Sequence, residues 1–289
     1  MTTMTLAPAR ARLALPNVPW AAWIASLTLA VFALAALAPG LLATHDPQAL
    51  DLGATLQAPS AAHWFGTDES GRDLYSRVVH GTGQSLAIGL GATAVSLSIA
   101  LVLGTVAGLG AGGSVLGRLL AGLVGRIIEI LFAFPTLLLA LLLIAVTGPS
   151  ATTQVLAVGI GTAPGYARMI RGQVLAVRGS GHVEAAVVLG HPQARIVLRH
   201  VLPGALRPLV AIFTLAIGQS IVWASGLSFL GLGVAPPSPE WGALLDAGRA
   251  YVVHAGWLVV IPGLVIVVLA LCATTLGRHL QSVLEKGER

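Results

Sequence analysis

Five long stretches of the chain contain no Asp, Glu, Lys or Arg. They cover residues 13–45, 78–117, 130–167, 208–239 and 250–277. A helix that crosses a bilayer needs about 20 mostly apolar residues, and Thr147-Gly148-Pro149-Ser150 is a turn signal that divides the third stretch in two. The pattern therefore predicts six membrane-spanning helices. They fall at Trp20–Leu42, Ser85–Leu109, Leu119–Val146, Thr152–Arg168, Leu206–Leu227 and Trp257–Leu276.

The composition also indicates a membrane protein. Of the 289 residues, 56% are hydrophobic and only 9% are charged, and the mean hydropathy is +0.87. Soluble domains carry about 25% charged residues, because their surfaces need solvation. This excludes an ordinary cytosolic enzyme, a disordered chain and a fibrous protein. The predicted fold class is an all-α polytopic membrane protein.

The basic residues predict the orientation of the chain. Thirteen of the 16 Lys and Arg residues fall on one side of the predicted membrane, and Arg72, Arg77 and Arg249 fall on the other. Because cytoplasmic loops retain positive charge, both termini are predicted to be cytoplasmic. The net charge of +5 then reflects topology, and no nucleic-acid partner is expected, since no basic stretch interleaves with exposed aromatic residues.

The predicted spans contain little chemistry of their own. Five of the six have no charged residue at their centre, which argues against a stand-alone secondary transporter. Lys286 is the only lysine, so no P-loop can form, and Cys272 is the only cysteine. His182, His191 and His200 are nine residues apart, which places them half a turn out of phase on a continuous helix, so we do not expect them to converge. No catalytic residue, metal site or bound cofactor is predicted.

Residues 184–203 predict a short helix, a break and a second helix on the cytoplasmic side. Ala185 and Ala186 give the first helix a smooth face and good helix propensity. Gly190 suits the position just after that helix, and Pro192 suits the first position of the next one. A small-faced helix that projects into the cytoplasm is typical of a surface that fits a partner's groove.

The second of these helices carries a basic side. Arg195 and Arg199 lie four residues apart, and Pro203 is expected to end the pair before the fifth span. The whole connection, residues 169–205, is long for a compact membrane protein, and long loops are usually functional.

This segment resembles the permease subunits of ATP-binding-cassette (ABC) importers. Their signature reads EAA, three residues, G, nine residues and I-x-L-P. His200 stands here where the signature has Ile. The matching residues are Glu184, Ala185, Ala186, Gly190, Leu202 and Pro203.

Three further stretches narrow the resemblance. Residues 63–77 resemble the HxxGTDxxGRDxxSR stretch of the second, C-type permease of dipeptide, oligopeptide and nickel importers. Residues 229–242 are similar to the FLGLG and PPxPxWG stretches of the same family, and residues 168–173 are similar to its ARxxRGQ. Each stretch alone is a weak signal, but together they are specific and cover about residues 60–276.

The resemblance implies a type I ABC importer permease fold and a set of partners. These are a homologous permease in a heterodimer, two cytoplasmic ATPases or one fused ATPase, an external substrate-binding protein and the bilayer of a prokaryotic inner membrane. ATP and Mg²⁺ would be bound by the ATPases, not by this chain. The implied organisation is a cytoplasmic tail (1–19), a peripheral first helix (20–43), an external segment (44–84), a five-helix core (85–276) with a coupling loop (169–205) and an external segment (231–256), and a second tail (277–289).

The resemblance and the residues together suggest three sets of site residues. The set that couples to the ATPases is Glu184, Ala185, Ala186, Gly190, Arg195, Arg199 and Pro203. The set for receptor docking or an external gate is Asp68, Arg72, Asp73, Arg77, Pro236, Pro237 and Trp241. The set for the translocation pathway is Gln219, Ser220, Trp223 and Ser225.

Each set leaves an alternative open. Asp68, Arg72, Asp73 and Arg77 alternate in sign at helical spacing, so they either pair within the fold or dock a charged receptor. Trp241 suits a membrane interface. The polar residues of the fifth span either line the pathway or form interhelical hydrogen bonds. Peptides are the default substrate, with nickel complexes, haem, glutathione and opines as alternatives, and a scaffold is the remaining non-transport class.

Overall fold

The computed structural model describes residues 19–110, 114–206 and 209–286. Within these ranges the regular elements are helices, apart from one isolated bridge between Thr67 and Asp73, so the all-α prediction is confirmed. The helices are α1 (Trp20–Leu37), α2 (Leu74–Leu109), α3 (Val115–Ala133), α4 (Thr136–Thr147), α5 (Ala151–Arg178), α6 (Gly181–Val188), α7 (Gln193–Ile196), α8 (Leu202–Leu206), α9 (Leu209–Leu227), α10 (Trp241–Arg249) and α11 (Trp257–Lys286). Short 3₁₀ turns lie at Pro39–Leu41 and Leu52–Ala54, and π turns at Val197–Val201 and Ser228–Leu232.

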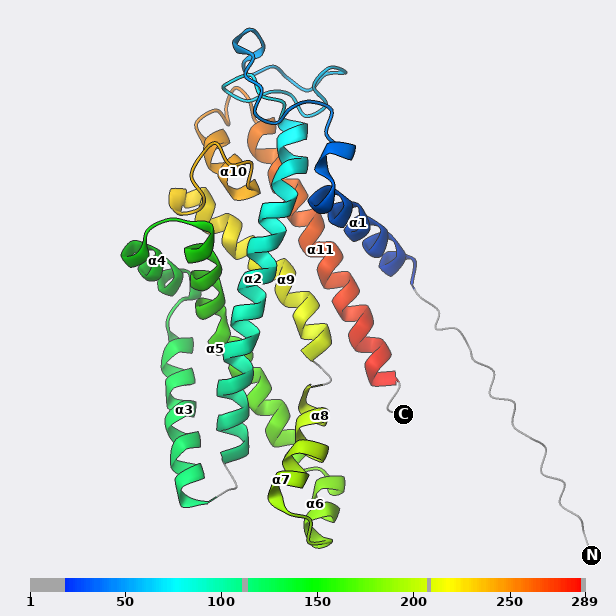
Figure 1. The fold of residues 1–289 in the computed structure, drawn as a ribbon, viewed down its shortest axis with the longest axis vertical. Helices are drawn as coiled ribbons and strands as arrows, with labels where there is room; N and C mark the ends of the chain where they lie inside the picture. Colours follow the sequence, from blue (N-terminus) through cyan, green and yellow to red (C-terminus); the bar gives the residue numbers. More distant parts are fainter. Residues whose placement is uncertain (1–18, 111–113, 207–208, 287–289) are drawn as a thin grey trace, which may run out of the picture.

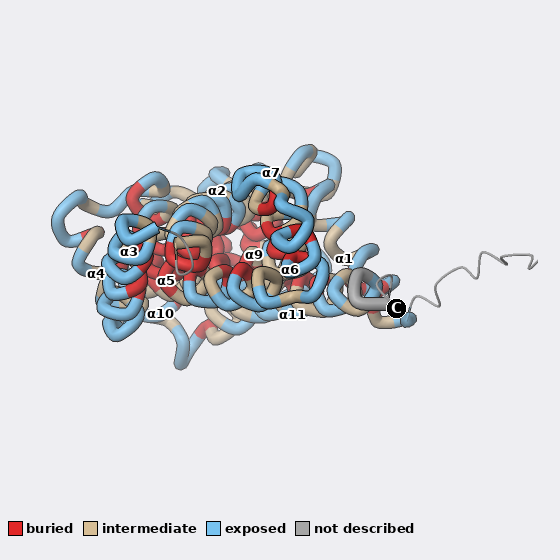
Figure 2. The backbone as a smooth tube through the Cα atoms, turned by 90° about the horizontal axis from the view of Figure 1, so that it is seen from below, coloured by how far each residue is buried: buried red, intermediate tan, exposed pale blue. Residues whose placement is uncertain are grey.

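The molecule is an elongated bundle with different structures at its two ends (Figure 1). Residues 44–73, which we call the cap, form loops at one end, close to α10. The short helices α6, α7 and α8 form the other end. The long helices α2, α5, α9 and α11 run between the two ends, and the buried residues follow this central group, whereas α3 and α4 lie outside it and are largely exposed (Figure 2).

Four described helical segments are long and apolar enough to cross a membrane. They are Trp20–Leu37, Leu74–Leu109, Ile212–Leu232 and Trp257–Val283, and the bent pair formed by α3 and α4 makes a fifth if it counts as one span. The remaining long helix, α5, measures about 42 Å at 1.5 Å per residue. Its second half carries arginines that lower its hydropathy. The count of six spans and the sidedness of the termini stay predictions.

The single helix predicted over Leu119–Val146 is wrong. The chain breaks between α3 and α4, and the two axes are bent by 91°. The break falls at Phe134-Pro135, where Phe134 has an extended ψ of 134°. Proline disfavours helical backbone in the preceding residue and supplies no N–H to the helix ladder, so Pro135 accounts for the break.

Several helices extend beyond their predicted ends. Helix α2 begins at Leu74 instead of Ser85, because Asp73 caps its first turn by accepting the N–H of Ser76 at 2.8 Å. Helix α5 continues to Arg178, so the first part of the predicted loop 169–205 is helical. Charge and polarity, on which the predicted bounds depended, report where apolar sequence stops and not where helical hydrogen bonding stops.

Small residues allow α2 and α5 to pack closely. A Cβ atom added to Gly104 would lie 2.6 Å from the carbonyl oxygen of Ala167, and one added to Gly108 would lie 2.6 Å from Val174. Four-residue spacing places Ala100, Gly104 and Gly108 on one face of α2, as expected for helices that approach closely in lipid. Without side chains at these glycines, the two backbones can nearly touch.

We predict that Gly104→Leu destabilises the protein by about 1–3 kcal/mol, because the new side chain collides with the backbone of α5. The measurement is thermal unfolding of the purified protein in detergent. Gly122→Leu is the matched control, since a Cβ at Gly122 meets no atom within 4 Å. Equal unfolding temperatures for the two variants would contradict this account of the packing.

Candidate functional site

The turn after α6 is built around Gly190. Its φ of +73° lies in the left-handed region that favours glycine. The N–H of Gly190 donates to the carbonyl of Val187 at 3.0 Å, and the N–H of His191 donates to the carbonyl of Ala186 at 3.2 Å. This double closure is a Schellman motif, so the prediction that Gly190 follows the end of the first short helix is confirmed.

The second part of the segment differs from the prediction at both prolines. Pro192 precedes α7 as its N-cap residue and is not the first helical residue. Pro203 lies inside helical structure, because the π turn Val197–Val201 leads directly into α8. Pro203 has no N–H for the carbonyl of Arg199, and the chain compensates with a wider turn in which Leu202 donates to Val197. Helical structure therefore continues through Pro203 and does not end there.

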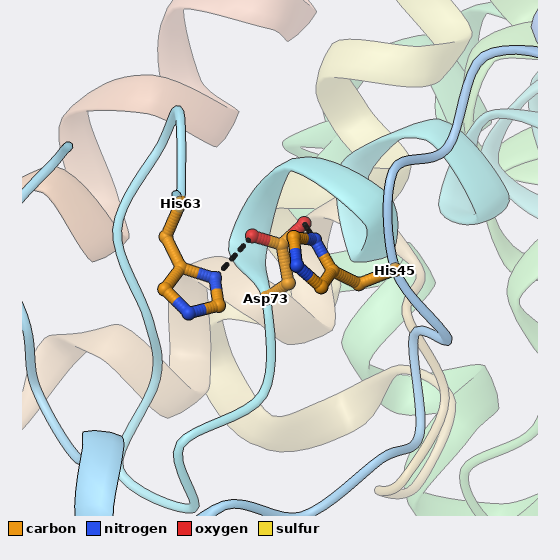
Figure 3. Close-up of side chains that lie close together, drawn as sticks. All are labelled: His45, His63 and Asp73. Carbon is orange, nitrogen blue, oxygen red and sulfur yellow. Dashed lines mark hydrogen bonds and ion pairs between the residues drawn. The ribbon is translucent and has the colours of Figure 1, made fainter. Parts of the chain in front are cut away.

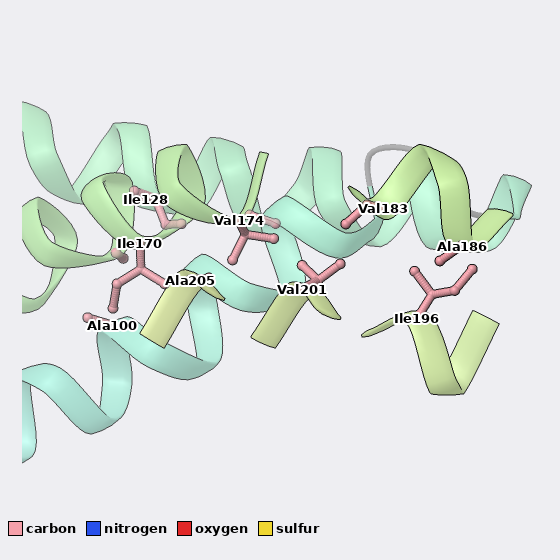
Figure 4. Close-up of a cluster of buried hydrophobic side chains, with 11 residues drawn as sticks. Ala100, Ile128, Ile170, Val174, Val183, Ala186, Ile196, Val201 and Ala205 are labelled. Carbon is pink, nitrogen blue, oxygen red and sulfur yellow. The ribbon is translucent and has the colours of Figure 1, made fainter. Parts of the chain in front are cut away.

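Helix α6 has one buried side and one exposed side. Val183 and Ala186 are 5% and 4% exposed and pack against Ile196 and Val201 in a cluster that continues to α5 and α2 (Figure 4). The opposite side, which we call the knob, is left uncovered by the part of the chain that the structure describes. The exposed residues of the knob are Glu184, Ala185, Val187, Val188 and Leu189.

The knob changes the predicted coupling set in two ways. Ala185 and Ala186 were expected to form one face, but only Ala185 is exposed. Val188 and Leu189, which the sequence analysis did not single out, are 86% and 74% exposed. Two neighbouring apolar residues at the end of a short extramembrane helix are the signal that could have identified them. Nearby, Arg195 and Arg199 are exposed as expected.

The prediction that the three histidines of this region do not converge is wrong. The ring of His200 lies 6.3 Å from the ring of His182 and 6.3 Å from that of His191, measured between centroids. The prediction assumed one continuous helix, whereas the chain reverses at Gly190 and brings the π turn back beside α6.

At the other end, the charges of the cap pair with one another. Asp68 accepts from Arg72 Nε at 2.8 Å and from Arg77 Nη1, and Arg72 also donates to Glu69 at 3.1 Å. The predicted helical spacing of Asp68, Arg72, Asp73 and Arg77 is wrong. Residues 68–73 form a tight loop in which Gly71 has a φ of +74°, and only Arg77 belongs to α2.

This charge network is buried. Asp68 and Arg77 are each 3% exposed. The backbone N–H groups of Ser70 and Arg72 donate to the other oxygen of Asp68, and Arg77 donates to the carbonyl of Pro237 at 3.4 Å. The network therefore joins the cap to α2 and to the chain before α10, and Asp68 and Arg77 present no free charge to a receptor.

Trp241 is buried in the core, so it exposes no aromatic surface that a membrane interface could contact. It is fully buried, its indole N–H donates to the carbonyl of Val78 at 2.9 Å, and its ring packs edge-on against Phe32. Glu240, which is 1% exposed, caps α10 by accepting the N–H groups of Gly242 and Ala243, both at 2.9 Å. The prediction missed Glu240, although an acidic residue just before a helix is a recognisable cap.

The four polar residues of α9 face two different environments. Ser220 and Ser225 are 1% and 4% exposed, and Ser220 accepts a hydrogen bond from Thr93 of α2 at 3.0 Å. These two serines therefore lie in helix contacts and do not line open space. Gln219 and Trp223 instead border a shallow hollow of about 430 Å³ with Gly218, Ala270, Thr274 and two α9 side chains.

Gln219 is also joined to α5. Its amide oxygen accepts a hydrogen bond from the Tyr166 hydroxyl at 2.8 Å. Elsewhere in the described ranges, His45, His63 and Asp73 bring ligand atoms close enough to hold a metal ion, although no metal site was predicted.

Comparison with known proteins identifies related sequences and folds. The family described as "Binding-protein-dependent transport system inner membrane component" matches residues 100–286. The "Probable D,D-dipeptide transport system permease protein" of Escherichia coli (strain K12) is 41% identical over 84% of this chain and 80% of that protein. A dipeptide transport system permease protein of Alkalihalophilus pseudofirmus is 37% identical over 88% and 82% of the two chains.

A further relative and a solved structure also resemble this chain. A glutathione transport system permease protein of Pectobacterium atrosepticum is 39% identical over 79% of this chain and 74% of that protein. An inward-facing structure of the MetNI methionine ABC transporter is 20% identical and matches with a TM-score of 0.60, covering 72% of this chain and 96% of that one. The chain therefore shares the fold of this transporter.

We predict that Asp68→Asn destabilises the protein by about 3–5 kcal/mol, because it leaves the buried charge of Arg77 without its partner. The asparagine oxygen can still accept the loop N–H groups, while its NH2 group replaces the oxygen that accepts from Arg72 and Arg77. The change therefore removes the charge and these two hydrogen bonds together. Glu69→Gln is the control, since Glu69 pairs at the surface and its loss is expected to cost less than about 1 kcal/mol. Chemical denaturation of both variants measures the difference, and equal losses would show that the buried pair is unimportant.

Proposed function

This chain belongs to the family of binding-protein-dependent transport system inner membrane components, and from that premise we propose that it forms half of the path for short peptides in an ATP-driven importer. It is a membrane-embedded permease subunit of the bacterial inner membrane. The proposal adds three elements: the surface that receives the force of ATP hydrolysis, the partners that deliver it and the class of substrate.

The knob is the observation that carries the proposal. It presents an acidic residue and uncovered apolar side chains, among them Val188 and Leu189, at the tip of the bundle. Its base, Val183 and Ala186, belongs to the same buried cluster as Val174 of α5 (Figure 4). Because packed interiors transmit displacement, a partner that pulls the knob would move α5, and with it α2.

The proposed partners follow from two features of the chain: it has no P-loop, and the knob is exposed. The only lysine, Lys286, is in no P-loop, so ATP and Mg²⁺ would be bound by two ATPase subunits or one fused ATPase. The same ATPase would contact the knob. A homologous permease would form a heterodimer with this chain and complete the pathway. A substrate-binding protein would deliver substrate to the cap.

Short peptides suit both the relatives and the hollow on α9. The relatives' names specify D,D-dipeptide, dipeptide and glutathione transport. The hollow is lined by Gln219 and Trp223 of α9 and by Thr274 of α11, whose hydroxyl also donates to the carbonyl of Ala270. Neutral hydrogen-bonding groups beside an aromatic ring can contact a peptide backbone without holding it by a fixed charge. Such weak binding suits a transport path, because the substrate must also leave. Nickel complexes, haem and opines are the alternatives.

We predict that Ala185→Trp abolishes peptide uptake and receptor-stimulated ATPase activity, while the chain still inserts and folds. Ala185 is exposed on the knob, so a large side chain there blocks the groove of the ATPase without disturbing the core. The measurement is ATP hydrolysis and uptake by the reconstituted complex, with the receptor loaded with dipeptide, longer peptide, nickel chelate or haem.

Val115→Trp is the control, because Val115 is 66% exposed at the start of α3, on a different helix at the same end of the bundle as the knob. Its complex is expected to keep wild-type activity. Wild-type activity in Ala185→Trp would refute the role of the knob. Stimulation of the wild-type complex by a nickel chelate or haem, and not by peptides, would refute the substrate and leave the knob unaffected.

A further inference from the structure

Three side chains from separate segments meet in the cap (Figure 3). His45 lies in the connection after α1, His63 in the following loop and Asp73 immediately before α2. His63 Nδ1 is 2.9 Å from one oxygen of Asp73, and His45 Nδ1 is 3.8 Å from the other. The two imidazole centroids are 4.9 Å apart, and one ligand atom from each residue lies within 4.8 Å of the others.

The surrounding structure holds two of these residues in place. The Asp73 side chain is 2% exposed, and one of its oxygens also accepts the N–H of Ser76 at 2.8 Å, which orients the carboxylate at the start of α2. The backbone N–H of His45 donates to the hydroxyl of the same Ser76 at 2.9 Å. Such supporting hydrogen bonds orient the ligands of metal sites in proteins.

We propose that His45, His63 and Asp73 bind a divalent transition-metal ion of the zinc class. Two imidazole nitrogens and one carboxylate oxygen form a ligand set that zinc takes with a fourth position left open. The open position would face solvent, because the side chains of His45 and His63 are 42% and 19% exposed. Calcium and magnesium prefer oxygen ligands and are disfavoured here.

A purely structural role explains only part of the cluster. The hydrogen bond between His63 and Asp73 accounts for the position of His63. It does not account for the side chain of His45. Among the residues that the structure describes, the close partners of its Nδ1 are the hydroxyl of Thr44 at 3.0 Å and the carboxylate of Asp73 at 3.8 Å. A metal ion gives both imidazoles a ligand role.

The site would tie the cap together. Its three ligands connect the segment after α1, the cap loop and the first turn of α2, and Arg77 in the next turn belongs to the buried charge network. Bound metal would therefore stabilise the folded cap, by an amount that rises with the logarithm of the free metal concentration divided by the dissociation constant. This role is independent of the proposed substrate and of the knob.

The test uses the full chain purified in detergent through a tag that contains no histidine, and stripped of metal with a chelator. Zn²⁺ is titrated by calorimetry, and Co²⁺ is followed by its visible absorption. We expect saturable binding in the wild type. His45→Ala and His63→Ala should each weaken Zn²⁺ binding by at least about tenfold and remove the cobalt band. Asp73→Asn should also weaken binding, while the asparagine still caps α2.

Two control variants separate this site from other histidines. His254→Ala removes an exposed histidine from the turn after α10 and should leave binding unchanged. A triple variant with glutamine at positions 182, 191 and 200 should also retain the cobalt band. The proposal fails if the wild type binds no zinc, if His45→Ala and His63→Ala bind like the wild type, or if only the triple variant loses the band.

Discussion

The close contact between α2 and α5 is the constraint on which the rest of the structure depends. Helix α2 begins at the cap, both helices reach the region of the knob, and glycine at positions 104 and 108 lets their backbones meet. Every other functional element is attached to this pair. The knob joins it through Val174, the charge network of the cap joins it through Arg77, and α9 joins it through the hydrogen bonds of Ser220 and Gln219. These contacts join the knob, the cap and α9 to one closely packed pair of helices.

The two ends of the pair are built for different tasks. At the cap, charges are buried and paired, so this end is rigid and costly to open. At the knob, the neighbouring apolar side chains Val187, Val188 and Leu189 are left uncovered, and exposed apolar residues that lie together mark a contact surface. The hollow on α9 lies between them and is lined by neutral polar, aromatic and apolar residues. This distribution suits a subunit that receives force at one end and solute at the other.

The sequence predicted much of this arrangement, because membrane spans and tight turns have local causes. Charge-free stretches located the long helices, and Gly190 marked the end of α6. The misses have two kinds of cause. Pro135 indicates the break between α3 and α4, but the prediction gave more weight to the long apolar run on either side of it. The other misses depend on contacts between distant segments, which residue spacing along the chain does not encode. They are the convergence of His182, His191 and His200, the burial of Trp241, and the meeting of His45, His63 and Asp73.

The most direct test of the central claim is site-specific photocrosslinking from the knob in the assembled complex. A photoreactive amino acid would replace Val188, which is 86% exposed, and in a matched experiment Val253, which is 85% exposed at the opposite end. The account predicts that position 188 crosslinks to an ATPase subunit, with a yield that changes when ATP is bound, and that position 253 does not. Equal crosslinking to the ATPase from both positions, or none from position 188, would contradict it.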